Sequence, residues 1–413
     1  MIQADRGLNK VVPTKHPMSA NAFSATSAPD NRSSLQPAPS SGNALSEFFR
    51  YHGIWAPGIR LFRAIGFRAK AMVISAMFMV PIVWLAFTYY KDKGAAVAFS
   101  AKELVGVAYA REAMPLLGAL QDQRQAAMAE AVSGKPAPNG AELQASLDAA
   151  FKKLAAAEAA MGAELVTDKA YATLLAQARA LPPASSGPEK VMEAHNELLA
   201  AFIALITTST DNSNLTLDPD LDTYYLMDNS LGALPQVAES LAQMRDMSVA
   251  VISGHQPSAA FSKRIAALEV LGDLSDERWS AGMSKIATVH PTIADELGTE
   301  GAQKKLHAFH ELAASSESAA KLLSAGDEAL KDVLVAQDKT LAKLGELIEV
   351  RVSGLETERQ ITTAVLVLGL FGVWYLFVSF RKVLDGGLKE VAFHIDAMRD
   401  GDLTTRPRAW GAD

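Results

Sequence analysis

Two arginines in helix-forming surroundings are the best candidates for binding a small anion. Arg124 ends the segment 115–124, and Arg245 ends the segment 235–245. A guanidinium group holds a carboxylate or a nitrate-like anion through two parallel N–H donors. Each segment opens with proline and runs as an apolar helix to its arginine, then on to a Ser-Gly end and a proline turn. This echo predicts either a duplicated helical hairpin with the arginines at comparable heights, or two similar alanine-rich helices whose arginines reach solvent.

A run of carboxylates forms a second candidate site. Asp218, Asp220 and Asp222 alternate along the chain, and such hard oxygen ligands suit Ca²⁺. An EF-hand is excluded, because its obligatory glycine and glutamate are replaced by threonine and asparagine. The favoured interpretation is structural: Pro219 blocks a helix, and Asp222 caps a new helix that begins at Thr223. The alternative is a ligand or cation site.

Two tyrosines and two histidines complete the chemically interesting residues. Tyr224 and Tyr225 follow the carboxylates and are expected to shape a ligand pocket at the helix break, together with Asp222. His307 and His310 are one helical turn apart and can share a metal, but without a third ligand nearby they are better interpreted as solvated. The sequence contains no Ser-His-Asp or Cys-His pattern and no phosphate-binding glycine loop. We therefore expect no enzymatic activity and no cofactor.

Two apolar stretches determine where these residues are placed. Residues 71–90 and 361–380 carry no charge, and a twenty-residue helix covers the roughly 30 Å hydrocarbon core of a bilayer. The first stretch is too long and too far from the N-terminus for a typical cleaved signal peptide, although Ala96-Val97-Ala98 resembles a cleavage site. We expect an inner-membrane protein with two spans and the lipid bilayer as a partner.

Charge predicts the orientation of the two spans. Residues 1–90 carry 9 Lys and Arg against 3 Asp and Glu, whereas residues 91–360 carry 24 against 37. Basic residues flank the outer ends of both spans, so both termini are expected in the cytoplasm and 91–360 in the periplasm. Residues 1–47 are expected to be disordered. Residues 48–70 mix aromatics with arginines, which favours a membrane collar over nucleic-acid binding.

The periplasmic segment 91–360 has the composition of a helical bundle. It is rich in alanine and leucine, contains no cysteine, and shows no alternating strand pattern. Breaks are expected at 134–140, 181–188, 217–220, 254–257 and 290–291, with a softer one at Gly326-Asp327, where Asp327 caps the helix that continues into the second span. The prediction is all-α: an elongated antiparallel bundle of six or seven helices of about 25–40 residues between two transmembrane helices.

The segment 381–413 carries a heptad pattern. Apolar residues with alternating spacings of four and three indicate a coiled-coil seam, and a Gly-Asp-Leu sequence then ends the helix. The seam and its end are the expected signal relay: Leu384, Leu388, Val391, Ile395, Met398, Gly401, Asp402 and Leu403. Such a seam predicts a homodimer.

This arrangement resembles the N-terminal sensory half of a methyl-accepting chemotaxis receptor. Residues 381–413 are similar to the first helix and connector of a HAMP domain, in which Gly401, Asp402 and Leu403 match the usual Gly-Asp-Leu. The proline that often starts the first HAMP helix is absent. The helix around Arg124 is distantly similar to the arginine helix of nitrate-sensing NIT domains, although Gln125 stands where those have glycine.

The resemblance implies a transmembrane chemoreceptor for a periplasmic ligand. That ligand would be a small anion, bound directly or through a periplasmic binding protein, and the signal would pass to cytoplasmic kinase-coupling machinery through a further C-terminal domain. Two alternatives remain open. The segment can instead be the input half of a histidine kinase or cyclic-di-nucleotide enzyme, or it can be a membrane-anchored bundle that senses nothing.

Overall fold

A computed structural model describes residues 53–406 of the chain. The chain comprises two compact units, residues 1–76 and 77–413. The described part of the first unit holds the short turn η1 (Gly53–Trp55), α2 (Ala56–Ala64) and the beginning of α3. The predicted tail, 1–47, and the last residues of the predicted HAMP segment lie outside the described range.

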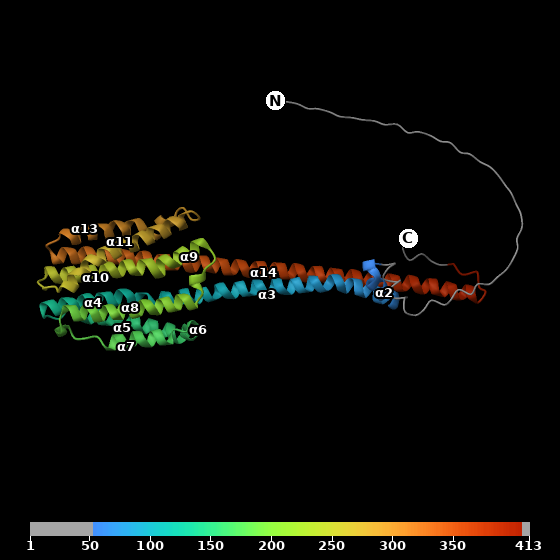
Figure 1. The fold of residues 1–413 in the computed structure, drawn as a ribbon, viewed down its shortest axis with the longest axis horizontal. Helices are drawn as coiled ribbons and strands as arrows, with labels where there is room; N and C mark the ends of the chain where they lie inside the picture. Colours follow the sequence, from blue (N-terminus) through green and yellow to red (C-terminus); the bar gives the residue numbers. More distant parts are fainter. Residues whose placement is uncertain (1–52, 407–413) are drawn as a thin grey trace, which may run out of the picture. The chain divides into compact units, whose positions relative to one another are not determined.

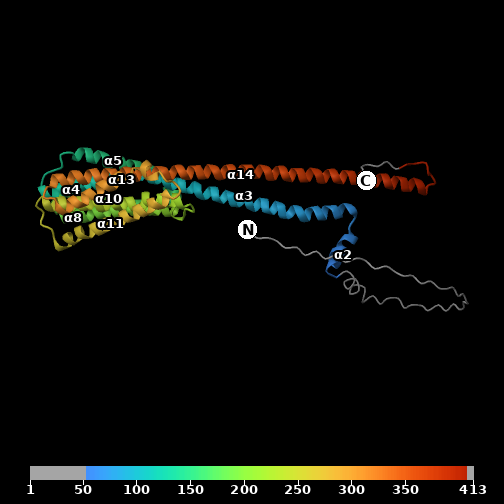
Figure 2. The same cartoon turned by 90° about the horizontal axis from the view of Figure 1, so that it is seen from above.

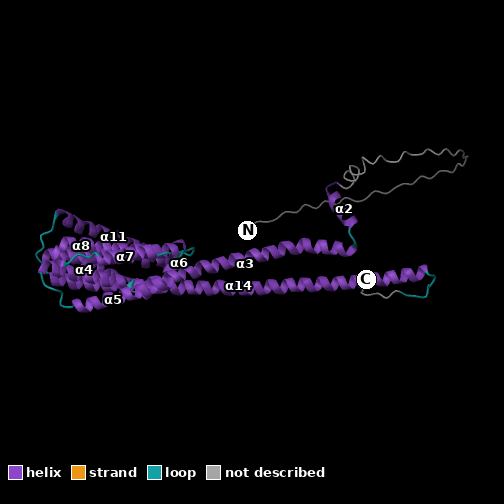
Figure 3. Cartoon of the chain, turned by 90° about the horizontal axis from the view of Figure 1, so that it is seen from below, coloured by secondary structure: helices purple, strands orange, loops and turns teal. Residues whose placement is uncertain are grey.

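All regular structure in residues 53–406 is helical, and this part of the chain contains no strand (Figure 3). The all-α prediction is therefore confirmed. The principal helices are α3 (Phe67–Ala113), α4 (Pro115–Ser133), α5 (Gly140–Ala157), α6 (Ala163–Leu165), α7 (Asp168–Arg179), α8 (Pro188–Asn212), α9 (Leu221–Met227), α10 (Leu234–Ile252), α11 (Ala259–Ala287), α12 (Ile293–Leu297), α13 (Thr299–Ser315) and α14 (Ala319–Arg399). Two π-helical turns interrupt them, η2 (Glu158–Gly162) and η5 (Asp228–Ala233).

Eight of these helices form two groups with matching topology (Figure 1). In the first group, α4 packs against α5 and α8, and α7 packs against α8. In the second group, α10 packs against α11 and α14, and α13 packs against α14. Each group is thus a four-helix bundle whose first helix contacts its second and fourth. This match is what duplication of a helical unit would produce.

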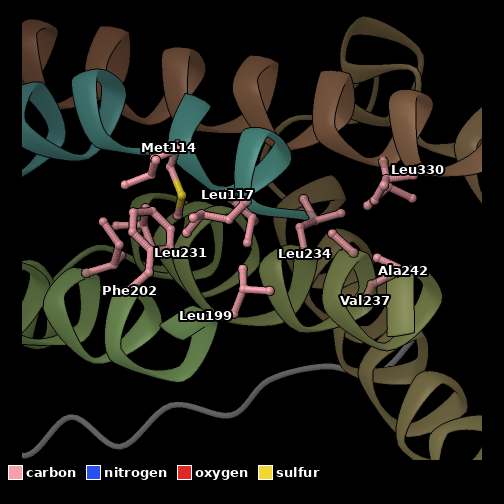
Figure 4. Packing of buried hydrophobic residues seen from close by; sticks show 14 of the residues in the cluster. Met114, Leu117, Leu199, Phe202, Leu231, Leu234, Val237, Ala242 and Leu330 are labelled. Atoms are coloured by element: carbon pink, nitrogen blue, oxygen red, sulfur yellow. The ribbon is translucent and has the colours of Figure 1, made fainter. Parts of the chain in front are cut away.

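One hydrophobic core runs through both groups, because α4 also packs against α10. Figure 4 shows Leu117 of α4 and Leu199 of α8 beside Leu234 and Val237 of α10, with Leu330 of α14 further along. All five side chains are buried. Removing apolar surface from water contributes about 25 cal/mol per Å², so this shared core stabilises the two groups as one body.

The helices differ in length from the prediction of six or seven helices of 25–40 residues. The expected breaks at 134–140, 181–188, 217–220, 254–257 and 290–291 are all present. A further break separates α3 from α4 because Pro115 has no N–H to continue the helical ladder. Another lies at Val166, whose left-handed backbone (φ 53°) ends α6.

The predicted break at Gly326-Asp327 is wrong. The helix instead begins at Ala319, where the Ser318 hydroxyl caps it by accepting from the amide of Lys321. Gly326 lies inside α14 and makes room for a neighbouring side chain: a Cβ there would lie 2.7 Å from Cγ of Arg245. The glycine is a packing feature and not a helix end.

Two long helices leave the same end of the bundle, which we call its base (Figure 2). The 81 residues of α14 span about 120 Å at 1.5 Å per residue. Both α3 and α14 contain a stretch long and apolar enough to cross a membrane. Several large apolar side chains there, including Met77, Trp84, Leu368 and Leu376, are more than half exposed, as expected for side chains that face lipid.

Candidate functional site

The structure brings the two predicted arginines together where α4 of the first four-helix bundle packs against α10 of the second. We call this region the joint. Arg124 lies on α4 and Arg245 on α10, two 19-residue helices with proline at the first or second position. Each helix is followed by a glycine with positive φ, Gly134 (69°) and Gly254 (106°). Neither arginine reaches solvent, since their side chains are 0% and 1% exposed. The interpretation that each arginine extends to solvent is therefore wrong.

A single carboxylate bridges the two guanidinium groups. Asp246 accepts from Nε of Arg124 through Oδ2 at 2.9 Å, and from Nε of Arg245 through Oδ1 at 2.9 Å. Its side chain is 0% exposed. An isolated buried charge costs several kcal/mol, so this bridge compensates two cations that would otherwise be strongly destabilising.

Further polar groups complete the surroundings of Arg124. Its Nη1 donates to Glu239 at 2.5 Å and to Asn196 at 2.9 Å. Glu239 also accepts from Gln121 at 3.0 Å and from Gln243 at 2.6 Å. These bonds tie α4 to α8 and α10. Within this group of side chains, Nη2 of Arg124 and Oε1 of Gln121 are buried without a hydrogen-bond partner among the described residues.

Arg245 extends toward α14 and the surface. Its Nη1 donates to Oδ1 of Asp327 at 2.7 Å, and that carboxylate is half exposed. A groove of about 550 Å³ passes this point, and three acids are among its lining residues. Its lining is Asp122, Arg245, Asp327, Leu330, Lys331, Leu334, Val335 and Asp338. The ion network thus has one buried side, at Arg124, and one side that water reaches, at Asp327.

Burial and charge act in opposite directions on these groups. Burial alone would lower the pKa of Arg124, but Glu239 and Asp246 together raise it, and Arg245 follows the same pattern with Asp246 and Asp327. Burial raises the pKa of Asp327, and the charge of Arg245 only partly offsets this effect. Both arginines are therefore permanently charged. Asp122 and Asp327 both line the groove, and burial raises the pKa of each carboxyl above its ordinary range.

A histidine beside the network is held neutral. His195 on α8 is buried, and burial lowers its pKa to about 4, with the charge of Arg124 acting in the same direction. Its Nδ1 has no hydrogen-bond partner among the described residues. An imidazolium there would place a second cation close to the guanidinium group of Arg124.

A small cavity lies beside the bridge, between the last turns of α4 and α10. Its volume is about 220 Å³ and Asp246 forms part of its wall. The other lining residues come from corresponding turns of the two helices: Gln125, Met128, Ala129, Val132 and Ser133, and Val249, Ala250 and Ser253. A compact ligand would therefore meet both bundles at once.

The other predicted ligand-binding residues are not part of this site. Tyr224 and Tyr225 lie on α9, with ring centroids 5.2 Å apart in an edge-to-face arrangement. Twenty helical residues separate them from Arg245, a distance of roughly 30 Å. The prediction that these tyrosines and Arg245 bind one ligand would need such a ligand to be long.

Asp222 does not cap a helix at Thr223. The helix begins two residues earlier, at Leu221, because the Asp218 carboxylate organises the turn by accepting from the amide of Asp220 at 2.9 Å and the hydroxyl of Thr223 at 2.8 Å. Asp222 sits in the first turn and contacts Nε2 of His290 at 2.9 Å. Its predicted role in ligand binding stays a prediction.

His307 and His310, which were interpreted as solvated in preference to a metal pair, have separate acidic neighbours. Nε2 of His307 lies 3.0 Å from Asp276, and Nδ1 of His310 lies 3.8 Å from Asp273. Within residues 53–406, no group of three or more His, Asp or Glu residues is arranged to hold a metal ion.

The predicted relay residues lie at the end of α14. Leu388, Val391, Ile395 and Met398 are all more than half exposed in the single chain. The helix ends as predicted: Gly401 has a φ of 89°, and the amide of Asp402 donates to the carbonyl of Ala397 at 2.9 Å, a Schellman-type end.

Sequence reasoning missed the acids that define the site. Asp246 directly follows Arg245, and Glu239 lies on the same helix, but neither was singled out. The sequence did contain a signal for them, because charged residues within a mostly apolar helix are rarely buried unless they are paired with an opposite charge.

No family model, no curated protein and no solved structure matches this chain.

Proposed function

We propose that this chain is the sensory half of a homodimeric membrane signal transducer with two spans, and that the joint between its two bundles receives the ligand. The continuity of α14 carries this proposal. One helix runs without interruption from Asp327, at the ion network, through the apolar stretch 361–380 to the exposed seam at Leu388–Met398. That path measures about 100 Å, so a small tilt or shift at the joint would reach the far end.

A small anion at Arg245 is the ligand that the groove supports best. Asp327 is half exposed, and burial raises its pKa, so it is the carboxylate that an incoming anion would most easily replace on the guanidinium group. Replacing a carboxylate that belongs to α14 removes one polar contact between that helix and α10. Ligand binding is thereby linked to the position of the signalling helix.

The proposed membrane topology is inner-membrane, with both termini cytoplasmic and the bundle outside. The exposed apolar stretches on α3 and α14 and the charge difference between chain segments support it. The chain contains no cysteine, so an introduced cysteine is the only thiol in the protein that a labelling reagent can modify. A membrane-impermeant maleimide applied to intact cells should label Glu300→Cys on α13, and should label Lys389→Cys only after permeabilisation. Labelling of Lys389→Cys in intact cells would refute the topology.

Oxidative cross-linking tests the homodimer. Leu388→Cys and Ile395→Cys lie on the predicted seam, whereas Ala397→Cys lies on the opposite face of the same helix. The two seam variants should form disulfide-linked dimers in membranes, and the control should form far fewer. Equal cross-linking of all three would show that the seam is not the interface.

Thermal unfolding of the full chain in nanodiscs, against a panel of organic and inorganic anions, tests the ligand class. A bound anion raises the melting temperature according to its concentration relative to Kd. Arg245→Lys keeps the charge but loses the two-pronged donor, so it should reduce that shift. The exposed Arg179→Lys on α7 should not. If no anion raises the melting temperature, the proposed ligand class is wrong.

A further inference from the structure

A second ion cluster lies at the base of the bundle, away from the joint. Arg351 of α14 donates through Nη1 to Asp218 at 2.7 Å and to Asp220 at 2.8 Å. Its Nη2 donates to the other oxygen of Asp218 at 3.1 Å and to Glu103 of α3. One guanidinium group therefore joins three segments: α3, the turn before α9, and α14. We call these four residues the basal clasp.

The clasp has more buried negative charge than its one cation balances. The side chains of Glu103 and Asp218 are 0% exposed, and that of Arg351 is 13% exposed. Burial raises the pKa of Glu103 to about 7, the charge of Asp218 adds to this, and Arg351 opposes it. Ser100, one turn earlier on α3, is the remaining polar group that faces the carboxyl.

The turn that carries Asp218 is pressed against α3. A Cβ added at Gly106 would lie 2.1 Å from Oγ of Ser213 and 2.9 Å from Cδ1 of Leu215, so only glycine fits there. The same turn starts α9, which leads through η5 into α10 and Arg245. A movement of the turn away from α3 would therefore displace α9 and, through η5, the helix α10 that carries Arg245.

The clasp also lies close to both apolar stretches. Glu103 is 13 residues beyond residue 90, and Arg351 is ten residues before residue 361, or about 20 Å and 15 Å along the two helices. Between the clasp and these stretches, α3 and α14 are joined by polar contacts such as Lys93 to Glu358 at 2.8 Å. The clasp thus joins the two helices at the point where they leave the bundle.

We propose that Glu103 is a proton-binding site that closes and opens the basal clasp, so that the chain responds to the pH around the base of its bundle. With a proton on Glu103, one buried cation faces one buried anion, Asp218, and the clasp is closed. When Glu103 releases its proton to water, two buried carboxylates face each other across Arg351. Opening the clasp then lets Glu103 reach solvent. This proposal needs neither the anion site nor the seam.

Distance measurement between spin labels tests the proposal directly. Lys91→Cys and Gln360→Cys are exposed positions below the clasp on α3 and α14, and the chain has no other cysteine. In the full chain in nanodiscs, the distance between the labels should lengthen or broaden as the pH rises from about 5.5 to about 8.5, the range that brackets the pKa of Glu103. The rise in pKa from 4.5 to about 7 corresponds to a change of up to about 300-fold in the ratio of closed to open molecules.

Three variants separate the clasp from a general effect of pH. Glu103→Gln should hold the short distance at every pH, because its amide cannot ionise. Glu112→Gln, an exposed acid on the same helix, should keep the wild-type transition. Asp218→Asn should move the midpoint to lower pH, because it removes the charge that disfavours ionised Glu103.

Two results would overturn the proposal. One is a wild-type distance that stays constant over this pH range, and the other is a transition in Glu103→Gln that matches the wild type. Neither result bears on anion binding at Arg245 or on cross-linking at the seam, so the proposed function and the basal clasp fail independently.

Discussion

Replacing Glu103 or His195 by glutamine is expected to change the pH dependence of folding stability in opposite directions. The folded-state pKa of Glu103 is raised from 4.5 to about 7. Its contribution to stability is therefore fully present below about pH 4.5 and is lost as the pH rises to about 7. The folded-state pKa of His195 is lowered from 6.5 to about 4. Its contribution is fully present above about pH 6.5 and is lost as the pH falls to about 4.

The two effects have similar size. Each pKa differs from its ordinary value by about 2.5, which at 1.36 kcal/mol per pH unit corresponds to about 3 kcal/mol. Both side chains are at least 97% buried, so solvent screening removes little of this. Between about pH 4.5 and 6.5 the two slopes oppose each other in the wild-type chain. Each single variant should unmask the slope of the other group.

Melting temperature as a function of pH measures these slopes. In the full chain in nanodiscs, followed by circular dichroism at 222 nm, the difference between variant and wild type isolates the replaced group. About 3 kcal/mol corresponds to roughly 6–12 °C for a bundle of this size. Relative to wild type, Glu103→Gln should gain stability as the pH rises from about 5 to 7. His195→Gln should gain stability as the pH falls from about 6.5 to 4. Parallel curves for wild type and both variants would refute the reasoning.

Three further substitutions test the packing of the ion network and of the turn at the base, each read as a change in melting temperature of the full chain. Asp246→Asn leaves two buried guanidinium groups without their shared anion and should reduce the free energy of unfolding by about 3–5 kcal/mol. The control Asp338→Asn, at an exposed position on α14, should change it little. Similar losses of stability in both variants would show that the bridge is not buried. Gly326→Ala places a methyl group 2.7 Å from Cγ of Arg245 and should cost about 1–3 kcal/mol, and the matched Gly354→Ala, which meets nothing within 4 Å, should be neutral or slightly stabilising. Gly106→Ala would push the turn at Ser213 away from α3. It should destabilise the chain by about 1–3 kcal/mol, seen as a lower melting temperature, and should also lower the pH midpoint of the label distance across the clasp. An unchanged midpoint would show that the position of this turn does not affect Glu103.

The sequence was sufficient to predict the helical class and the two apolar stretches, and it showed the similarity of the segments 115–124 and 235–245. Proline near the start and Ser-Gly at the end of two similar segments predict α4 and α10 closely, because these residues act through local backbone chemistry. Arg124 and Arg245 were found for the same reason: the repeat brought out two similar positions. Local rules do not say which way a helix is rotated, so the sequence left open whether the two arginines are buried or reach solvent.

Two of the missed features share one cause, which is that the decisive partner is distant in sequence, whereas the third concerns residues that are close in sequence but far apart along a helix. Gly326 was interpreted as a helix break because the side chain that needs the space, Arg245, lies 81 residues earlier. Arg351 was not noticed because the acids that it binds lie about 130 and 250 residues away. Tyr224 and Tyr225 were grouped with Arg245, although about 30 Å of helix separates them.

Both ion clusters end on the same helix, and this has a thermodynamic consequence. Asp327 contacts Arg245 at the joint and Arg351 forms the clasp, with 24 residues of continuous α14 between them, about 36 Å. If a ligand at the joint binds more tightly when the clasp is closed, linkage requires that proton binding to Glu103 strengthens ligand binding by the same factor. A saturating anion should then move the midpoint of the label distance toward higher pH. The same anion should bind more weakly to wild type at about pH 8.5 than at about pH 5.5, and equally at both in Glu103→Gln. An anion that binds at the joint but leaves the midpoint unchanged would show that α14 does not connect the two clusters.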